Sequence, residues 1–292
     1  MKVKEIPVVF SCRSVELMGI LHQPDVPLHN GVLIVVGGPQ YRVGSHRQFV
    51  LLARMLADNG VPVMRFDYRG MGDSQGGIHS FSEVDDDIMS AVNVFYQNSP
   101  GLSRVVIWGL CDAASAASFY AYQDKRVKGL ILLNPWVYTE QGAAKTYLKH
   151  YYLQRLFNPE LWRKVFSLQF NYQQSFSSLV LLLKNMLMKT VSNQQTNNTE
   201  AVSLVDSSMS LPDRVRECLD RFDSPVLFIL SGRDLTADEF REVVKSDEKW
   251  QSLFELPDVN TVELVGADHT FSSQKWRDEV SQLTLHWVSQ LQ

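Results

Sequence analysis

The 292-residue sequence contains few cysteines, and those it contains lie far apart in the chain. Cys12, Cys111 and Cys218 form no CxxC pair, so no zinc site is indicated, and their odd number argues against a disulfide framework. We therefore expect no metal and no other cofactor. A chain that relies on free thiols suits a reducing compartment, and we expect a cytoplasmic protein.

The sequence also lacks long hydrophobic runs and a strong excess of one charge. No uninterrupted apolar run approaches the length of a transmembrane helix. Residues 1–14 have no apolar stretch followed by a small-residue cleavage site, so we expect no signal peptide. The 28 basic and 32 acidic residues give a net charge of −4, which provides no reason to expect a nucleic-acid partner.

Hydrophobic residues make up 45% of the chain and charged residues 21%, a balance that supports a large folded core. In the first half, runs rich in Val, Ile and Leu alternate with helical patterns. Because these runs show no polar alternation, they predict strands buried on both faces of a parallel sheet. Two earlier runs, residues 6–11 and 15–22, predict an antiparallel hairpin at its edge. The buried strands are expected at residues 31–36, 61–66, 104–108 and 127–133, and the helices between them at 47–58, 82–96 and 112–122.

The alternation stops after residue 135 and returns near residue 223. Between these points aromatic and leucine residues recur at helical spacing, interrupted by a polar tract at 192–200. We therefore predict a core formed by residues 1–135 and 223–292 and a helical insertion at 136–222. Its place inside an α/β sheet favours a lid over the site, and a helical subdomain without that role is the alternative. The second part of the core is expected to hold strands at 226–230 and 261–265 and helices at 238–245 and 274–291.

Cys111 stands where a predicted strand meets a predicted helix. Residues 109–113 read G-x-C-x-A, which has the form of the nucleophile elbow G-x-S-x-G, a tight turn that holds a nucleophile clear of the sheet. Ala113 replaces the second glycine. The helix N-terminus favours a thiolate, so Cys111 is the predicted nucleophile. The alternative is an inert buried cysteine, which is our interpretation of Cys12 and Cys218.

An acid and a histidine follow the cysteine in the order that α/β-hydrolases use. Asp234, in Gly-Arg-Asp after a strand, is the predicted acid that orients the histidine, and His269 is the predicted base. Asp238 and Asp268 are rival acids, and Asn134 holds the other known acid position without a charge. A turn or helix-capping aspartate is the alternative role of Asp234. A chance occurrence is the alternative for His269, because the chain has seven histidines.

The turn that follows the strand at 31–36 is predicted to complete an oxyanion hole with the backbone after the nucleophile. The two expected donors are the backbone N–H groups of Gly38 and Asp112, because Pro39 has no N–H to offer. Gln40, Arg42 and His46 come next and are predicted to line the entrance, where the basic groups would attract an anionic substrate. A solvated basic loop is the alternative.

Residues 67–74, D-Y-R-G-M-G-D-S, resemble the loop after the fourth strand of α/β-hydrolases and predict a structural role. They nearly match a dinucleotide-binding motif, but Gln75 occupies the third glycine position, so that interpretation is rejected. The whole chain resembles the α/β-hydrolase superfamily, most narrowly the bacterial exosortase A system-associated hydrolases, type 1. The narrower resemblance rests on residues 35–54 and 108–117, V-V-G-G-P-Q-Y-R-V-G-S-H-R-Q-F-V-L-L-A-R and W-G-L-C-D-A-A-S-A-A.

The resemblance implies an α/β-hydrolase fold, with a mostly parallel central sheet flanked by helices and a helical lid insertion. It also implies an esterase or thioesterase activity, in a setting beside exopolysaccharide export and protein sorting, with no named substrate. We expect a hydrolase that cleaves a small-molecule acyl ester or thioester through a covalent acyl-enzyme on Cys111. CoA or a carrier protein is the candidate carrier of the acyl group. The alternatives are an acyltransferase with the same acyl-enzyme and a non-catalytic scaffold that kept the fold.

Overall fold

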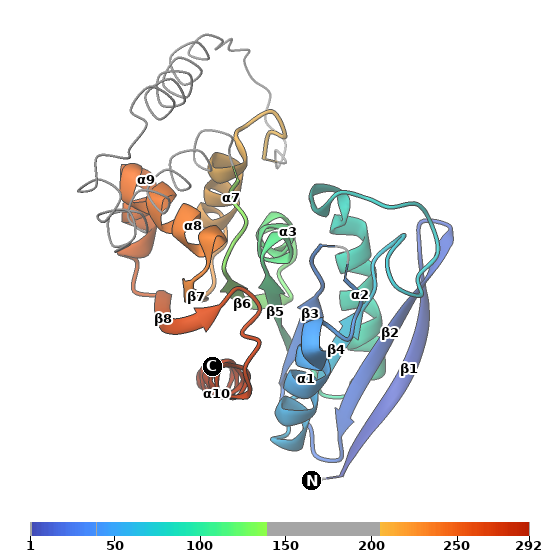
Figure 1. Ribbon diagram of the computed structural model, residues 1–292. Coiled ribbons are helices and arrows are strands. Elements are labelled where there is room, and N and C mark those ends of the chain that lie inside the picture. Colours follow the sequence, from blue (N-terminus) through green and yellow to red (C-terminus); the bar gives the residue numbers. More distant parts are fainter. Residues whose placement is uncertain (1, 39, 139–204, 292) are drawn as a thin grey trace, which may run out of the picture. The chain divides into compact units, whose positions relative to one another are not determined.

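The computed structural model of the protein describes residues 2–38, 40–138 and 205–291. In this part of the chain one eight-stranded sheet has the strand order β1-β2-β4-β3-β5-β6-β7-β8 (Figure 1). β1 pairs with β2 and β2 with β4 in antiparallel register, and every later pair is parallel. The predicted edge hairpin and mostly parallel sheet are therefore confirmed. The strands are β1 (Val3–Cys12), β2 (Val15–Pro24), β3 (Asn30–Val35), β4 (Val63–Phe66), β5 (Arg104–Leu110), β6 (Val127–Leu133), β7 (Val226–Arg233) and β8 (Val259–Asp268).

Helices cover both faces of this sheet. Successive side chains of a strand point to opposite faces, and the apolar side chains on each face are buried by the helices that pack there. On β3, Ile34 packs in one cluster with Phe49 of α1 and Trp287 of α10. A side chain at Gly31 would instead meet Phe95 of α2, at 2.7 Å, on the opposite face. α3 packs beside α2 and α7, and α8 packs on β7 and α9. The α-helices are α1 (Gln48–Asp58), α2 (Asp85–Asn98), α3 (Asp112–Ala121), α7 (Leu211–Asp220), α8 (Leu235–Ser246), α9 (Glu248–Phe254) and α10 (Gln274–Gln290), with short 3-10 turns at Ser45–Arg47 and Phe81–Glu83.

α9 was not predicted from the sequence, which indicated only the helix at 238–245 before it. Asp247 ends α8 in an extended conformation and begins α9, where its carboxylate accepts the backbone N–H groups of Lys249 and Trp250 at 2.8 and 3.2 Å. α7 lies within the predicted insertion at 136–222 and packs against α3. The division into core and insertion, and the lid, stay predictions, because residues 139–204 lie outside the described part of the chain.

The parallel strands bring five sequence-distant turns to one edge of the sheet. Parallel strands all end on the same side, and α/β folds bind ligands outside these carboxyl ends. Gly37 and Gly38 follow β3, Cys111 follows β5, Asn134 follows β6, Asp234 follows β7 and His269 follows β8.

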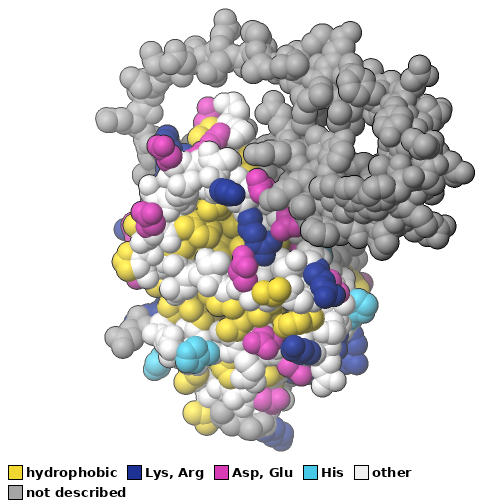
Figure 2. Space-filling view, turned by 60° about the vertical axis from the view of Figure 1, so that its left-hand side comes forward, with side chains coloured by type: hydrophobic (Ala, Val, Ile, Leu, Met, Phe, Trp, Pro, Cys, Tyr) yellow, Lys and Arg dark blue, Asp and Glu magenta, His cyan; other side chains and the backbone are white. Residues whose placement is uncertain are grey.

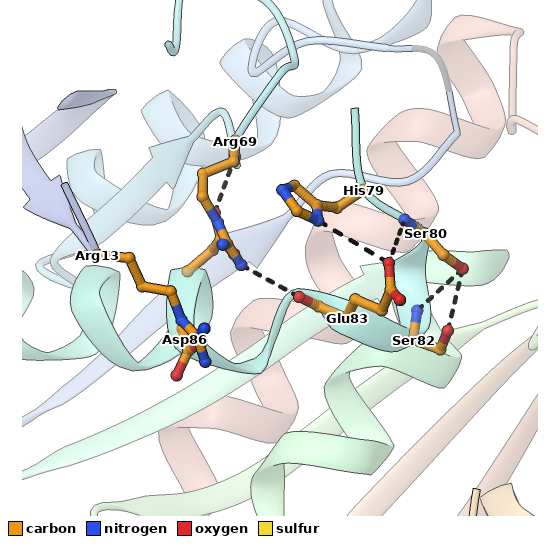
Figure 3. Close-up of polar contacts among 8 residues, drawn as sticks. Arg13, Arg69, His79, Ser80, Ser82, Glu83 and Asp86 are labelled. Atoms are coloured by element: carbon orange, nitrogen blue, oxygen red, sulfur yellow. Dashed lines mark hydrogen bonds and ion pairs between the residues drawn. The ribbon is translucent and has the colours of Figure 1, made fainter. Parts of the chain in front are cut away.

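Charged contacts hold the loop after β4, which leaves the sheet at the same carboxyl edge because β4 is parallel to β3. The backbone and guanidinium of Arg69 donate to the Asp87 carboxylate at 2.7–3.0 Å, and the guanidinium also donates to the Glu83 carbonyl at 3.2 Å (Figure 3). Arg13, in the turn between β1 and β2, pairs with Asp86 of α2. These contacts fit the structural role predicted for the loop.

The surface on the side of β7 and β8 mixes hydrophobic and charged side chains (Figure 2). Val265 of the edge strand β8 is 74% exposed, and Leu235 and Leu256 are also exposed. Within the described ranges no helix combines the length and the apolar character that a membrane crossing requires.

Candidate active site

Cys111 sits on a sharp turn between β5 and α3. Its backbone has φ 63° and ψ −123°, a conformation that residues other than glycine rarely adopt and that costs free energy. The turn is held because Cys111 N–H donates to the Leu133 carbonyl at 2.9 Å and the Cys111 carbonyl accepts Ala114 N–H at 3.0 Å. Gly109 is required, since a Cβ there would lie 2.6 Å from the Ala113 oxygen. The predicted elbow geometry is therefore present, and Cys111 is half-buried whereas Cys12 and Cys218 are buried.

His269 and Asp234 meet at the carboxyl edge of the sheet. Nδ1 of His269 lies 2.8 Å from Oδ2 of Asp234, whose side chain is only 7% exposed. Hydrogen bonding to Asp234 and then to Cys111 raises the pKa of His269 to about 10, against the opposing effect of burial. The three predicted triad residues are thus brought together: His269 and Asp234 are hydrogen-bonded, and Cys111 and His269 line the same pocket. Asp234 also caps α8, accepting the N–H groups of Thr236 and Ala237 at 3.2 Å, so the capping role weighed for it is present beside its contact with His269.

The two rival acids engage other groups. Asp268 accepts the backbone N–H of Ser272 at 2.8 Å and also its hydroxyl. Burial would raise the pKa of Asp268, but these hydrogen bonds outweigh it and the pKa is lowered. Asp238 pairs with Arg241 at 2.8 Å. The geometry therefore matches the choice of Asp234 as the partner of His269.

Asn134 has a part in the site that sequence reasoning missed. Its amide nitrogen donates to the His269 carbonyl at 3.0 Å and to Ser231 Oγ at 2.8 Å, and its amide oxygen accepts Ser231 N–H at 2.8 Å. Ser231 Oγ in turn donates to the Asp268 carbonyl at 2.8 Å. The fully buried Asn134 thereby ties β6 and β7 to the loop that carries the histidine. The only signal in the sequence was a polar residue at the end of a buried strand.

One of the two predicted oxyanion donors, the Gly38 N–H, is already occupied by the carboxylate of Asp112. Gly38 N–H donates to Asp112 Oδ2 at 2.8 Å. Burial raises the pKa of Asp112, while hydrogen bonds from the backbone N–H groups of Gly38, Ala113 and Asp112 itself favour the charged form. A Cβ at Gly37 would lie 2.1 Å from Asp112 Oδ1. The turn after β3 and the first turn of α3 therefore form a cradle that closely surrounds this carboxylate.

A pocket of about 450 Å³ opens beside Cys111. Gln40 is in its wall, as predicted, but Arg42 and His46 are not among the lining residues. Arg42 binds Asp67 and Asp73 instead, and His46 is exposed. Among the described residues, no group of three or more His, Cys, Asp or Glu side chains is arranged to hold a metal ion. The lining residues are Gly37, Gly38, Gln40, Phe49, Phe81, Leu110, Cys111, Asp112, Trp136 and His269.

The family model for serine aminopeptidase, S33, matches residues 29–250, from β3 into α9. The chain belongs to this S33 family. Membership makes it a hydrolase of the α/β-hydrolase type. The family is named for a serine enzyme, whereas the elbow of this member presents Cys111.

Solved structures share the fold of this S33 family member at low sequence identity. The esterase Pf2001 from Pyrococcus furiosus has a TM-score of 0.65 at 16% identity, over 99% of this chain and 93% of that chain. Dienelactone hydrolase from Anabaena variabilis has a TM-score of 0.60 at 14% identity, over 100% and 99%. The acylaminoacyl peptidase from Pyrococcus horikoshii has a TM-score of 0.60 at 14% identity, over 100% of this chain and 42% of that chain. Among curated proteins, none matches the chain significantly.

Proposed function

We propose that this S33 family member cleaves an ester or thioester through a covalent acyl-enzyme on Cys111. The observation that carries the proposal is the hydrogen-bonded pair of His269 and Asp234 in the pocket that Cys111 also lines, with the cysteine held on a sharp strand-to-helix turn. A partly accessible thiol on such a turn, near a histidine that an acid orients, is the arrangement that activates a cysteine for attack on a carbonyl.

The proposed reaction has two halves. The Cys111 thiolate, paired with protonated His269, attacks the acyl carbon, and a C–S bond forms while the carbonyl oxygen becomes an oxyanion. The C–O or C–S bond to the leaving group then breaks, and His269 gives its proton to that group. In the second half His269 takes a proton from water, the resulting hydroxide attacks the thioester, and the thiolate departs with the acid product released.

The substrate class follows from the walls of the pocket. Phe49, Phe81, Leu110 and Trp136 supply apolar surface beside the nucleophile, which suits an aliphatic acyl chain. An acyl thioester on CoA or a carrier protein is one form of that substrate, and a simple ester is the other. The resemblance of residues 35–54 and 108–117 to exosortase-associated hydrolases supports a role beside exopolysaccharide export. A cytoplasmic setting is part of the proposal, because an oxidising compartment would threaten a nucleophilic thiol.

The test is an activity screen with p-nitrophenyl esters and acyl-CoA thioesters of graded chain length, combined with intact-mass detection of an acyl adduct. We expect the adduct on Cys111 and a loss of at least about 10³-fold in turnover for Cys111→Ala. Cys218→Ala is the matched control, because Cys218 is buried and should leave turnover unchanged. Full activity of Cys111→Ala would contradict the proposal.

The same screen separates the two alternatives. An acyltransferase would form product only when an alcohol, amine or thiol acceptor is added, because its acyl-enzyme must resist water. A scaffold would show no adduct, and iodoacetamide would label Cys111 no faster than the two buried cysteines.

A further inference from the structure

The carboxylate of Asp112 occupies the position where a substrate oxyanion is expected. Asp112 Oδ2 takes the Gly38 N–H at 2.8 Å, and the N–H groups of Asp112 and Ala113 also stabilise its charge. A backbone N–H has a single proton and makes one well-aligned hydrogen bond at a time. As long as Asp112 holds the Gly38 N–H, that donor is lost to the substrate.

The fit between this carboxylate and the backbone is close. The turn at Gly37 has room for Asp112 only because glycine has no side chain, since a Cβ there would lie 2.1 Å from Oδ1 and 3.0 Å from Ala113 N. A carboxylate oxygen carries the charge and hydrogen-bonding geometry of the oxyanion that such a cradle is built to bind. Asp112 is therefore a competitor for the same donors.

Burial also disfavours the charged form of the Asp112 carboxylate in this position. Asp112 is half-buried beside the apolar wall of the pocket, and burial raises its pKa despite three backbone N–H groups. Two further titratable side chains face it besides the neighbouring Cys111: His269, from the loop after β8, and Tyr68, from the loop after β4. The pKa of Tyr68 is raised to about 12 by burial and then by the Asp112 charge. Because burial disfavours its charge, the Asp112 carboxylate is suited to be displaced from the Gly38 N–H by a substrate oxyanion.

We propose that the side chain of Asp112 is a specificity-determining gate, which fills the oxyanion hole at rest and must be displaced from Gly38 N–H before an acyl substrate reacts. The gate rests on the function proposed above, because it concerns the same nucleophile. It predicts that the enzyme discriminates against carbonyl compounds that bind the hole too weakly to displace a carboxylate.

The test uses a short alkyl trifluoromethyl ketone and measures binding rather than turnover. The Cys111 thiolate adds to the ketone carbon, a C–S bond forms, and the former carbonyl oxygen becomes an oxyanion in the hole. Fluorine NMR and intact mass report the adduct, and titration gives its Kd. Asp112→Ala removes the carboxylate but keeps the backbone N–H. We expect it to bind the ketone at least about tenfold tighter than the natural protein at pH 8, the equivalent of about 1.4 kcal/mol.

Two further variants make the comparison specific. Asp112→Asn preserves the shape and one acceptor oxygen without the charge, and we expect an affinity between those of the other two proteins. It also keeps an acceptor for the Gly38 N–H, so the test survives if Asp112→Ala folds poorly. Asp268→Asn removes a charge next to His269 without freeing Gly38, and we expect no tightening. The advantage of Asp112→Ala should shrink as the pH falls and the carboxyl of the natural protein takes up its proton.

The outcomes separate the proposed gate at Asp112 from the proposed acyl-enzyme function of Cys111. Equal or weaker binding by Asp112→Ala, with an adduct on Cys111 in both proteins, would overturn the gate and leave the proposed function intact. Equal tightening in Asp268→Asn would also overturn it, because the effect would then be one of net charge. No adduct in any folded variant would overturn the proposed nucleophile and the gate with it.

Discussion

Nδ1 of His269 lies 2.8 Å from Oδ2 of Asp234, and the same Asp234 carboxylate accepts the first free N–H groups of α8. Oδ2 of Asp234 therefore contacts both Nδ1 of His269 and the Ala237 N–H at the start of α8. The cap restricts the Asp234 carboxylate, because a side chain bound to two backbone N–H groups has little rotamer freedom left. The acid of the proposed triad is thus positioned by local structure on β7 and α8 and does not depend on the histidine for its orientation.

Asp234→Asn should lower kcat/KM far more than Asp268→Asn. The amide cannot orient and stabilise protonated His269 in the way that a carboxylate does, and a comparable change costs as much as ~10⁴ in rate in a well-studied serine triad. Asp268 is bound to Ser272 and should matter less than about tenfold. Steady-state kinetics on one p-nitrophenyl ester will check the order. The opposite ranking of the two variants would show that the triad acid has been misassigned.

The free energy of unfolding should depend on pH because His269 binds its proton more tightly in the folded state. Its pKa is raised from 6.5 to about 10, chiefly by Asp234, so the folded state binds this proton more tightly than the unfolded state. The resulting stabilisation is fully present below pH 6.5 and is lost as the pH rises through about 10. Urea unfolding of the natural protein and of His269→Gln at several pH values measures it. The natural protein should be the more stable at pH 6, with a difference that shrinks towards pH 10.

Asp234→Asn provides the control for this titration, because it removes the largest cause of the raised pKa. Its stability should follow the His269→Gln curve more closely than that of the natural protein. A stability difference that stayed constant from pH 6 to pH 10 would mean that His269 does not hold its proton in the folded state.

The strands and the sharp turn at Cys111 could be predicted from the sequence because each depends on local residue patterns. Buried parallel strands need continuous runs of apolar residues, and the elbow needs small residues around a strand-to-helix junction. The residues 104–113 contain both signals, and β5, Cys111 and α3 follow them closely. The choice of Asp234 rested on its place after a strand, which parallel topology converts into proximity to His269.

The contact between Asp112 and Gly38 was not predictable in the same way. Both residues were predicted to donate a backbone N–H to an oxyanion, but the observed contact joins positions that are 74 residues apart and depends on one side-chain rotamer. Asn134 was missed for a related reason. The sequence shows only that Asn134 carries no charge. Its amide donates and accepts hydrogen bonds, but the partners Ser231 and His269 become its neighbours only in the folded sheet.

Gly109→Ala should destabilise the protein and distort the elbow. The added Cβ would lie 2.6 Å from the Ala113 oxygen and 2.8 Å from Ala114 N, and backbone atoms of a helix cannot swing aside. Overpacking of this kind costs about 1–3 kcal/mol. Gly77→Ala is the matched control, because no atom lies within 4 Å of its added Cβ. Denaturant unfolding should place Gly77→Ala within about 0.5 kcal/mol of the natural protein. Similar losses in the two variants would show that the close approach at Gly109 is not what makes glycine necessary.

Asn134→Ala should lower both stability and kcat, and its effect should depend on Ser231. The change leaves the buried Ser231 N–H without its acceptor, at a cost of about 1–3 kcal/mol, and frees the carbonyl of His269 from its donor. A looser histidine loop should reduce kcat with little change in KM, since the pocket walls stay in place. Because Ser231 also holds the Asp268 carbonyl, the two residues form one network.

The double variant Asn134→Ala, Ser231→Ala decides whether this network acts as a unit. Residues in one hydrogen-bond network typically show an interaction energy of about 0.5–3 kcal/mol in a double-mutant cycle. We therefore expect the double variant to lose less stability and less kcat than the two single variants added together. Strictly additive losses, with kcat untouched in Asn134→Ala, would mean that Asn134 only fills space at the end of β6. A non-additive loss in kcat would identify it as the residue that positions the histidine.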